Sequence, residues 1–325
     1  QRNPRAYFRA LLPKSSEYTQ LVKEKIRLEN ALSQGGWGPT VPLSALKVGA
    51  TGGAVVTLRK RLTKMGFLRA TTSVNYDAKL VEGVKRFQRA HGLKADGEAG
   101  LTTLSQINVT MEQRLGSVLV AMERERWNNQ PLGERHILVN LADFTAKIMD
   151  HGITTFVSKS VVGANDSFRR SPEFSDMMSF MIINPSWYVP RSIIIKEYLP
   201  LLKDDPESVS HLEFRDDFGN VVNRSDIDFQ SYTGKDFPFG MREPPSQTNA
   251  LGLVKFMFPN IHNIYLHDTP AKNLFGKEVR AFSHGCIRLG RPFEFAYALL
   301  AHQENDPKRV FSDALSSGTE IRINL

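Results

Sequence analysis

The sequence contains one cysteine, Cys286, which lies in the stretch FSHGCIRLG. His284 precedes it by two positions, and His267 lies further upstream, at the end of the strand-like run IYLH. A thiolate beside an imidazole supplies the nucleophile and the base that acyl transfer requires. Since the end of a strand can hold an imidazole rigidly beside a neighbouring turn, the pattern predicts Cys286 as a nucleophile and His267 as its general base.

The residues around this pair suggest how a reacting carbonyl would be held. Gly285 has no side chain, so a substrate can approach the backbone, where the amides of His284, Gly285 and Cys286 can stabilise an oxyanion. Asp268 directly follows His267. Its backbone carbonyl or its carboxylate is expected to fix the imidazole tautomer, and we favour the carbonyl.

The alternative interpretation of these residues is structural. A lone cysteine is commonly a small buried hydrophobic residue, and an isolated histidine is more often packed or exposed than catalytic. The combination of two histidines, a glycine and a thiol favours catalysis instead. A single cysteine also excludes an internal disulfide and a cysteine-rich zinc site.

Two stretches carry a family resemblance. His267 with the later SHGCIRL resembles the catalytic signature of the L,D-transpeptidases, and NPSWYVP, residues 184–190, resembles another motif of that catalytic domain. The arrangement is most similar to large periplasmic Gram-negative members with an inserted binding domain and a capping subdomain. The resemblance implies Cys286 as nucleophile, His267 as general base, and His284 with Gly285 as the walls and donors of the oxyanion site.

Further residues near the signature are candidates for substrate binding. Tyr265 shares a strand face with His267, where it lines a pocket or packs in the core. Arg288 can hold a substrate carboxylate in a bidentate grip or buttress the loop. The other candidates are Ser283, Trp187 and Tyr188, although an Asn-Pro turn is a sufficient structural reason for the last two. The chain departs from some family members in having Ser171 rather than threonine before Pro172, and we expect no catalytic consequence.

The region before the catalytic part indicates a small helical bundle. In GGAVVTLRKRLTKMGF, apolar residues recur at helical spacing and Gly66 ends the run, and Asp77 is a candidate N-cap for a second helix. The order LKVGATGGAVVTLRKRL, VKRFQRAHGLKADGEAG and LTTL resembles the peptidoglycan-binding domain of bacterial wall enzymes. This resemblance implies a wall ligand, and a generic three-helix bundle is the alternative.

These patterns predict an α+β protein with a β-rich, mixed-sheet catalytic domain, a capping insertion, a three-helix peptidoglycan-binding domain and a helical scaffold. The scaffold is expected to be two packed helices between which the bundle is inserted. The predicted ranges are 1–43 and 110–134 for the scaffold, 44–109 for the bundle, 135–325 for the catalytic domain and about 191–253 for its insertion.

Composition bounds the location and the partners. The net charge of +8 is spread along the chain, and no nucleic-acid-binding module is recognisable, so we expect no nucleic-acid partner. The sequence has no run of about eighteen apolar residues, which is the length needed to cross a bilayer. The chain begins at Gln1 rather than at a methionine, so we expect it to be a segment excised from a longer protein. The resemblance implies a periplasmic protein, and a membrane anchor upstream stays open.

The resemblance also implies a reaction: a tetrapeptide donor stem forms a thioester, and its acyl group then passes to a second stem to give a 3-3 cross-link in peptidoglycan. This reaction needs neither a metal nor a cofactor. The implied partners are donor and acceptor stem peptides, other cell-wall synthesis proteins, and carbapenem β-lactams as inhibitors. Two alternatives stay open, an L,D-carboxypeptidase that hydrolyses the same thioester and a non-catalytic wall-binding protein. A papain-like protease fits poorly, because its base follows its cysteine in the chain whereas His267 precedes Cys286.

Overall fold

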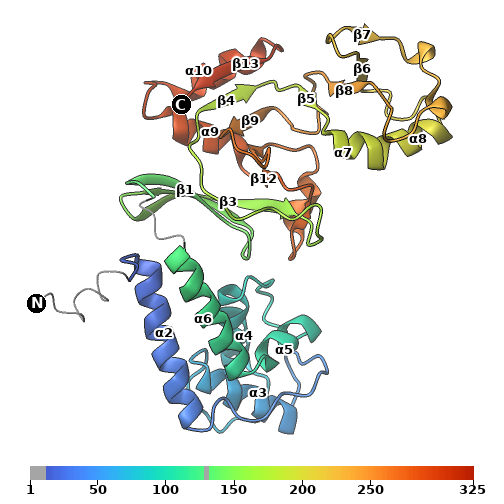
Figure 1. Ribbon diagram of the computed structural model, residues 1–325. Helices are drawn as coiled ribbons and strands as arrows, with labels where there is room; N and C mark the ends of the chain where they lie inside the picture. The colour runs from blue at the N-terminus through green and yellow to red at the C-terminus, as the bar shows by residue number, and fades with distance from the viewer. Residues whose placement is uncertain (1–11, 128–131) are drawn as a thin grey trace, which may run out of the picture. The chain divides into compact units, whose positions relative to one another are not determined.

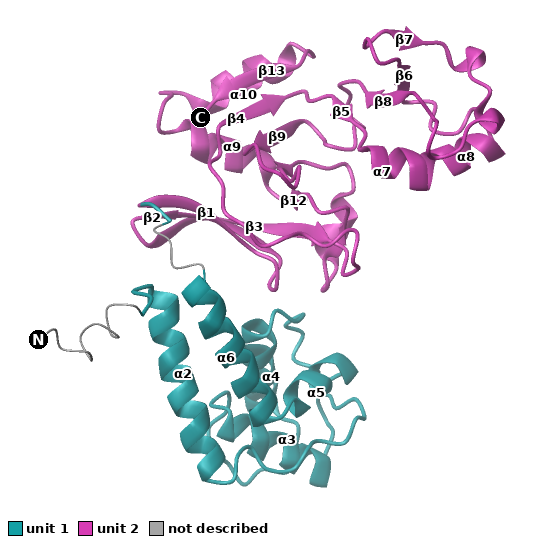
Figure 2. Ribbon diagram, viewed as in Figure 1, with its two compact units in different colours: residues 1–133 teal, residues 134–325 magenta. Residues whose placement is uncertain are grey.

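The protein is organised as two compact units. The computed structural model describes residues 12–127 and 132–325, and the chain divides into Gln1–Gly133 and Glu134–Leu325 (Figure 2). This division lies next to residue 135, where the catalytic domain was predicted to begin. Among the described residues, no helix combines the length and apolar character needed to cross a membrane.

The first unit contains the expected bundle of three short helices. They are α3 (Gly53–Lys64), α4 (Ala78–Ala90) and α5 (Leu101–Asn108). Leu58 and Leu62 are completely buried, as the helical spacing predicts. The side chain of Asp77 accepts a hydrogen bond from the amide of Leu80 at 3.0 Å and so caps α4. Gly66 ends the first helix with φ +86, a conformation that favours glycine.

Two longer helices from either side of the bundle form the scaffold. α2 (Ser16–Ser33) packs against α6 (Met111–Trp127) (Figure 1). Arg126 donates to the hydroxyl of Tyr18 at 2.9 Å and joins the two helices. Not every apolar residue of the two helices is buried, since Ile26 and Leu119 are 51% and 45% exposed. Buried residues of both helices contribute to one core with the bundle.

The second unit is built on one mixed sheet. Its strand order is β1-β2-β3-β12-β10-β9-β4-β13, with β11 beside β3. The pairs β10 with β12 and β11 with β3 are parallel, and the other pairs are antiparallel. The strands are β1 (Arg135–Asn140), β2 (Thr145–Asp150), β3 (Ile153–Gly163), β4 (Phe180–Ile183), β9 (Val254–Met257), β10 (Leu266–His267), β11 (Ala281–Ser283), β12 (Ile287–Leu289) and β13 (Ile321–Asn324).

The sheet buries one face against helices. α9 (Pro292–Leu300) and α10 (Pro307–Ser316) contribute Phe295 and Phe311 to a core that also contains Leu266 and Ile287. A short 3-10 turn, η4 (Lys272–Gly276), lies in the connection between β10 and β11. This packing decides which residues of β10 and β12 face away from the core.

The insertion has a sheet and a core of its own (Figure 1). Its strand order is β5 (Trp187–Tyr188), β8 (Gly240–Glu243), β6 (Glu213–Arg215) and β7 (Val221–Val222). Its helical segments are α7 (Arg191–Ile193), the π-helical turn η1 (Ile194–Tyr198), α8 (Leu199–Asp204), and the 3-10 turns η2 (Arg224–Asp226) and η3 (Phe229–Ser231). The sheet begins at Trp187, before the expected start at 191, because β5 pairs with β8.

Candidate active site

The register of two neighbouring strands brings the predicted chemistry onto one surface. In the parallel pair of β10 and β12, Leu266 lies opposite Ile287, and both are buried in the core. Successive side chains of a strand alternate between the two faces of a sheet. The residues that flank this pair therefore share the opposite face: Tyr265, His267, Cys286 and Arg288.

Cys286 is partly exposed and lies immediately before β12. Its Sγ donates to the backbone oxygen of Asn263 at 3.7 Å. Burial raises the pKa of the thiol to about 11, against hydrogen bonding from Tyr265 and the positive charge of Arg288, which lower it. The thiol is consequently protonated at neutral pH.

His267 ends β10, as the sequence predicted, and is 4% exposed. Burial, followed by the charge of Arg288, lowers the pKa of the imidazole to about 3. The backbone of Asp268 and of Leu251 opposes this shift. Neither meets Nδ1 with hydrogen-bond geometry, and among residues 12–127 and 132–325 this buried nitrogen has no partner. The imidazole is therefore neutral and able to accept a proton.

The carboxylate of Asp268 has partners other than the imidazole. It accepts a hydrogen bond from the amide of Leu253 at 3.0 Å and forms an ion pair with Lys272. Gly252 lies so close that an added Cβ would be 2.4 Å from the carboxylate. Of the two orienting groups that the sequence suggested, only the backbone of Asp268 lies beside the His267 ring.

The turn before the thiol is held by its own serine. Ser283 is 2% exposed, and its hydroxyl donates to the backbone oxygen of Cys286 at 2.6 Å. The same hydroxyl accepts from the amide of Gly285 at 3.1 Å. Ser283 is thus engaged within the turn rather than open to a substrate. Since the Gly285 amide is occupied, the amides of His284 and Cys286 remain as the candidate oxyanion donors.

A glycine is required at the centre of this turn. Gly285 has φ +116, and an added Cβ would lie 2.9 Å from Cδ1 of Ile264. Its backbone oxygen accepts a hydrogen bond from the hydroxyl of Ser171 at 2.6 Å, and that hydroxyl accepts from the amide of Gly163 at 2.9 Å. Ser171, for which no catalytic consequence was expected, therefore connects β3 to the cysteine turn.

Arg288 lies beside both titratable groups. In the strand register it faces His267, and burial lowers the pKa of its guanidinium while the thiolate form of Cys286 would raise it. Its Nε is buried and has no hydrogen-bond partner in the described part of the chain. A guanidinium in this position can meet a carboxylate or stabilise a thiolate.

The insertion reaches this surface through two of its residues. Nε2 of His284 donates to Oε1 of Glu197 in η1 at 2.6 Å. Burial raises the pKa of the Tyr265 hydroxyl, while a hydrogen bond from Trp187 in β5 lowers it. Tyr188, the other residue of β5, is 65% exposed. The guanidinium carbon of Arg242 lies 6.0 Å from the centroid of the Tyr188 ring.

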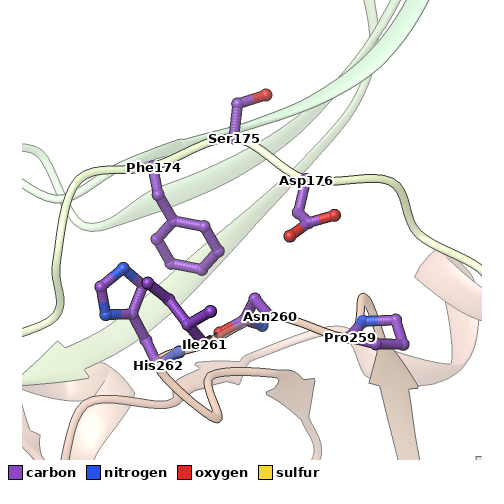
Figure 3. A pocket seen from close by; sticks show the side chains of 7 residues that line it. All are labelled: Phe174, Ser175, Asp176, Pro259, Asn260, Ile261 and His262. Atoms are coloured by element: carbon purple, nitrogen blue, oxygen red, sulfur yellow. Dashed lines mark hydrogen bonds between the residues drawn. The ribbon is translucent and has the colours of Figure 1, made fainter.

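An open cavity of about 460 Å³ lies beside the loop that carries Asn263. It is formed by residues 174–176 and 259–262 (Figure 3). The rings of Phe174 and His262 lie 5.0 Å apart, and the carboxylate of Asp176 points into the cavity (Figure 3). The cavity therefore offers apolar contacts from Phe174 and an anionic contact from Asp176.

Three contributors were not predicted from sequence. Ser171, Glu197 and Asn263 contact the turn or the thiol from segments 114, 87 and 23 residues away. Asn263 lies in the same run as Tyr265 and His267, but its residue type does not suggest a role at the site. Only the folded chain brings them to Cys286.

Two regions of the chain match known protein families. Residues 134–323 match the L,D-transpeptidase catalytic domain, and residues 51–107 match a family described as "Putative peptidoglycan binding domain". A protein of Haemophilus influenzae named "Putative L,D-transpeptidase" is 32% identical over 202 residues, which are 62% of this chain and 39% of that relative. The chain thus spans well under half of that relative's length.

A solved structure, that of an L,D-transpeptidase (residues 123–326) from Xylanimonas cellulosilytica, is 14% identical, with a TM-score of 0.23. The match covers 82% of this chain and 93% of the solved chain. The match to the catalytic-domain family extends over more than half of the chain. The chain therefore belongs to the L,D-transpeptidase family and carries a peptidoglycan-binding domain in its first unit.

Proposed function

We propose that this chain forms 3-3 cross-links in peptidoglycan by two acyl transfers through a thioester on Cys286. The observation that carries the proposal is the shared face of β10 and β12, where the thiol, a neutral imidazole and a guanidinium lie together. Membership of the L,D-transpeptidase family supports the same reaction class.

The first transfer breaks an amide bond of the donor stem. Sγ of Cys286 attacks the carbonyl carbon at the L-centre of the third residue, meso-diaminopimelate, and His267 accepts the thiol proton as the S–C bond forms. The amides of His284 and Cys286 stabilise the oxyanion. When the C–N bond breaks, His267 returns the proton to the leaving D-alanine, and a thioester remains.

The second transfer regenerates the thiol. The side-chain amine of diaminopimelate in a second stem attacks the thioester carbonyl, and His267 takes a proton from that amine. The C–S bond then breaks, and the proton passes to the departing sulfur of Cys286. Attack by water instead would be L,D-carboxypeptidase activity.

The other residues on this face are assigned to substrate binding. Arg288 is proposed to hold a stem carboxylate, and Tyr265 with Trp187 to border the donor. The proposed location is the periplasm, where both stems are present. Carbapenem β-lactams are proposed to acylate the same thiol, and no cofactor takes part in either transfer.

The test is incubation with purified disaccharide tetrapeptide, with products followed by mass. A dimer indicates transpeptidation, and a monomer shortened by one alanine indicates hydrolysis. Cys286→Ala should abolish both, and His267→Ala should reduce the rate about a hundredfold or more, the usual loss of a general base. His211→Ala, an exposed histidine of the insertion, is the matched control. A His267→Ala protein with near wild-type rate would exclude His267 as the base.

A further inference from the structure

A π-helical turn in the insertion presents two charged residues in succession. η1 (Ile194–Tyr198) interrupts the helical segment between α7 and α8. One additional residue in a turn rotates the side chains that follow, and such turns recur at functional sites. Here it leaves Ile194 at 2% exposure in the insertion's core, while Lys196 and Glu197 are exposed.

The apolar residues of this turn hold it in place within the insertion. Ile194 belongs to the core cluster, and Tyr198 packs edge-on against Trp187 with ring centroids 6.4 Å apart. Ile195 lies so close to Gly234 that an added Cβ there would be 2.5 Å from Cγ2. The direction in which η1 presents Lys196 and Glu197 is therefore determined by packing inside the insertion.

Both charged residues contact segments that lie outside the insertion and surround Gly285. Glu197 accepts the hydrogen bond from His284 at 2.6 Å. Nζ of Lys196 lies 4.1 Å from the ring centroid of Phe168. Phe168 belongs to the segment that ends at Ser171, whose hydroxyl donates to the backbone oxygen of Gly285. One turn of the insertion thus meets both segments that hold Gly285.

The contact with His284 differs from the other supports of the cysteine turn. The hydroxyls of Ser283 and Ser171 hold the turn from buried positions within the catalytic domain. The side chains of His284 and Glu197 are 35% and 45% exposed. A short hydrogen bond to a carboxylate fixes the ring of a histidine in one orientation. Because His284 also supplies a candidate oxyanion donor, its ring orientation affects the reacting backbone.

We propose that Glu197 is a positioning residue for the acyl transfer, acting through the side chain of His284 on the turn that carries Cys286. The proposal rests on the proposed function, since it concerns the rate of thioester formation. It means that the insertion contributes to the chemical step and is more than a cover over the substrate. Its effect is on the geometry of the transition state rather than on donor binding.

The experiment compares Glu197→Ala, Glu197→Gln, His284→Ala and the double variant Glu197→Ala/His284→Ala, with intact mass as the measure of thioester formation from disaccharide tetrapeptide. We expect kcat to fall about tenfold in Glu197→Ala with KM within about twofold, as for an interaction used in the transition state. Glu197→Gln keeps an oxygen that can accept from His284, and should retain part of the rate. Glu207→Gln, an exposed glutamate of the same insertion, should match wild type.

The double variant decides whether the effect passes through His284. If it does, the double variant is no slower than the slower single variant, because the two residues form one unit. The proposal is overturned if the rate losses of the two single variants multiply in the double variant. It is also overturned if kcat is unchanged in Glu197→Ala or if only KM changes.

Alkylation of Cys286 by iodoacetamide separates this inference from the proposed function. A wild-type protein that forms no thioester contradicts the proposed function, and the alkylation rates then decide the inference alone. A change of about threefold in the alkylation rate of Glu197→Ala, with no change in Glu207→Gln, supports the positioning of the thiol turn. Equal rates in wild type and Glu197→Ala overturn it.

Discussion

The thiol and the imidazole are both neutral in the folded protein. Burial raises the pKa of Cys286 to about 11 and lowers that of His267 to about 3, so neither carries charge at neutral pH. Composition and spacing had suggested a thiolate beside its base. The low exposure of His267 argues instead for proton transfer during attack, since charge separation in a dry site is costly. The positive charge of Arg288 lowers the free energy of the thiolate and raises that of the imidazolium.

This electrostatic arrangement predicts the pH dependence of thiol alkylation. Only the thiolate reacts, and a folded pKa above the ordinary 9.0 means that its fraction grows as pH rises towards about 11. The alkylation rate of Cys286 by iodoacetamide should therefore rise about tenfold per pH unit up to about pH 10 without levelling. Because the sequence has one cysteine, intact mass reports this thiol alone.

The control is the same measurement in denaturant, where the rate should level once pH exceeds the ordinary thiol pKa. A plateau in the folded protein near neutral pH would reveal a preformed thiolate and imidazolium pair, and would contradict the neutral arrangement.

At the scale of elements, a buried serine connects β3 to the cysteine turn. The hydroxyl of Ser171 bridges the amide of Gly163 and the backbone oxygen of Gly285. Gly163 makes this bridge possible, because an added Cβ would lie 2.0 Å from the backbone oxygen of Arg169. The segment after β3 can therefore return directly over the strand and reach the turn.

Removing the Ser171 hydroxyl leaves both of its backbone partners without a hydrogen bond. Ser171→Ala should reduce the free energy of unfolding by about 1–3 kcal/mol, the usual cost of unpaired buried polar groups. Denaturant unfolding measures the loss. Ser175→Ala, an exposed serine later in the same loop, should change stability by less than about 0.5 kcal/mol. Equal stabilities of the two variants would show that the bridge contributes nothing.

At the scale of the whole molecule, the two units have separate cores. The first unit carries the peptidoglycan-binding domain, and the second carries the site with Cys286. The wall recognition and the acyl transfer that we propose therefore belong to units with separate hydrophobic cores. Each unit has the buried apolar residues that an independent domain requires.

We expect residues 134–325 alone to form a thioester with soluble disaccharide tetrapeptide at close to the full rate. The same fragment should sediment with isolated sacculi much less than the full chain. The full chain with Cys286→Ala provides the matched control, since it should sediment as the wild type does. If the fragment and the full chain sediment equally, the wall ligand binds outside the first unit.

The local parts of this protein could be predicted from its sequence alone. Apolar spacing and glycine stops determine the helices of the first unit, and Asp77 caps α4 through a contact three residues away. The end of β10 at His267 also agrees with the strand-like run IYLH. Such features depend on backbone conformation and short contacts, which neighbouring residue types largely specify.

The tertiary structure alone decided how the cysteine turn is held and charged. The contacts of Gly285 with Ser171 and of His284 with Glu197 join residues 114 and 87 positions apart. The neutral state of Cys286 and His267 depends on how completely the folded chain removes them from water. Burial and long-range contact are sums over distant segments, and no local pattern of residue types encodes them.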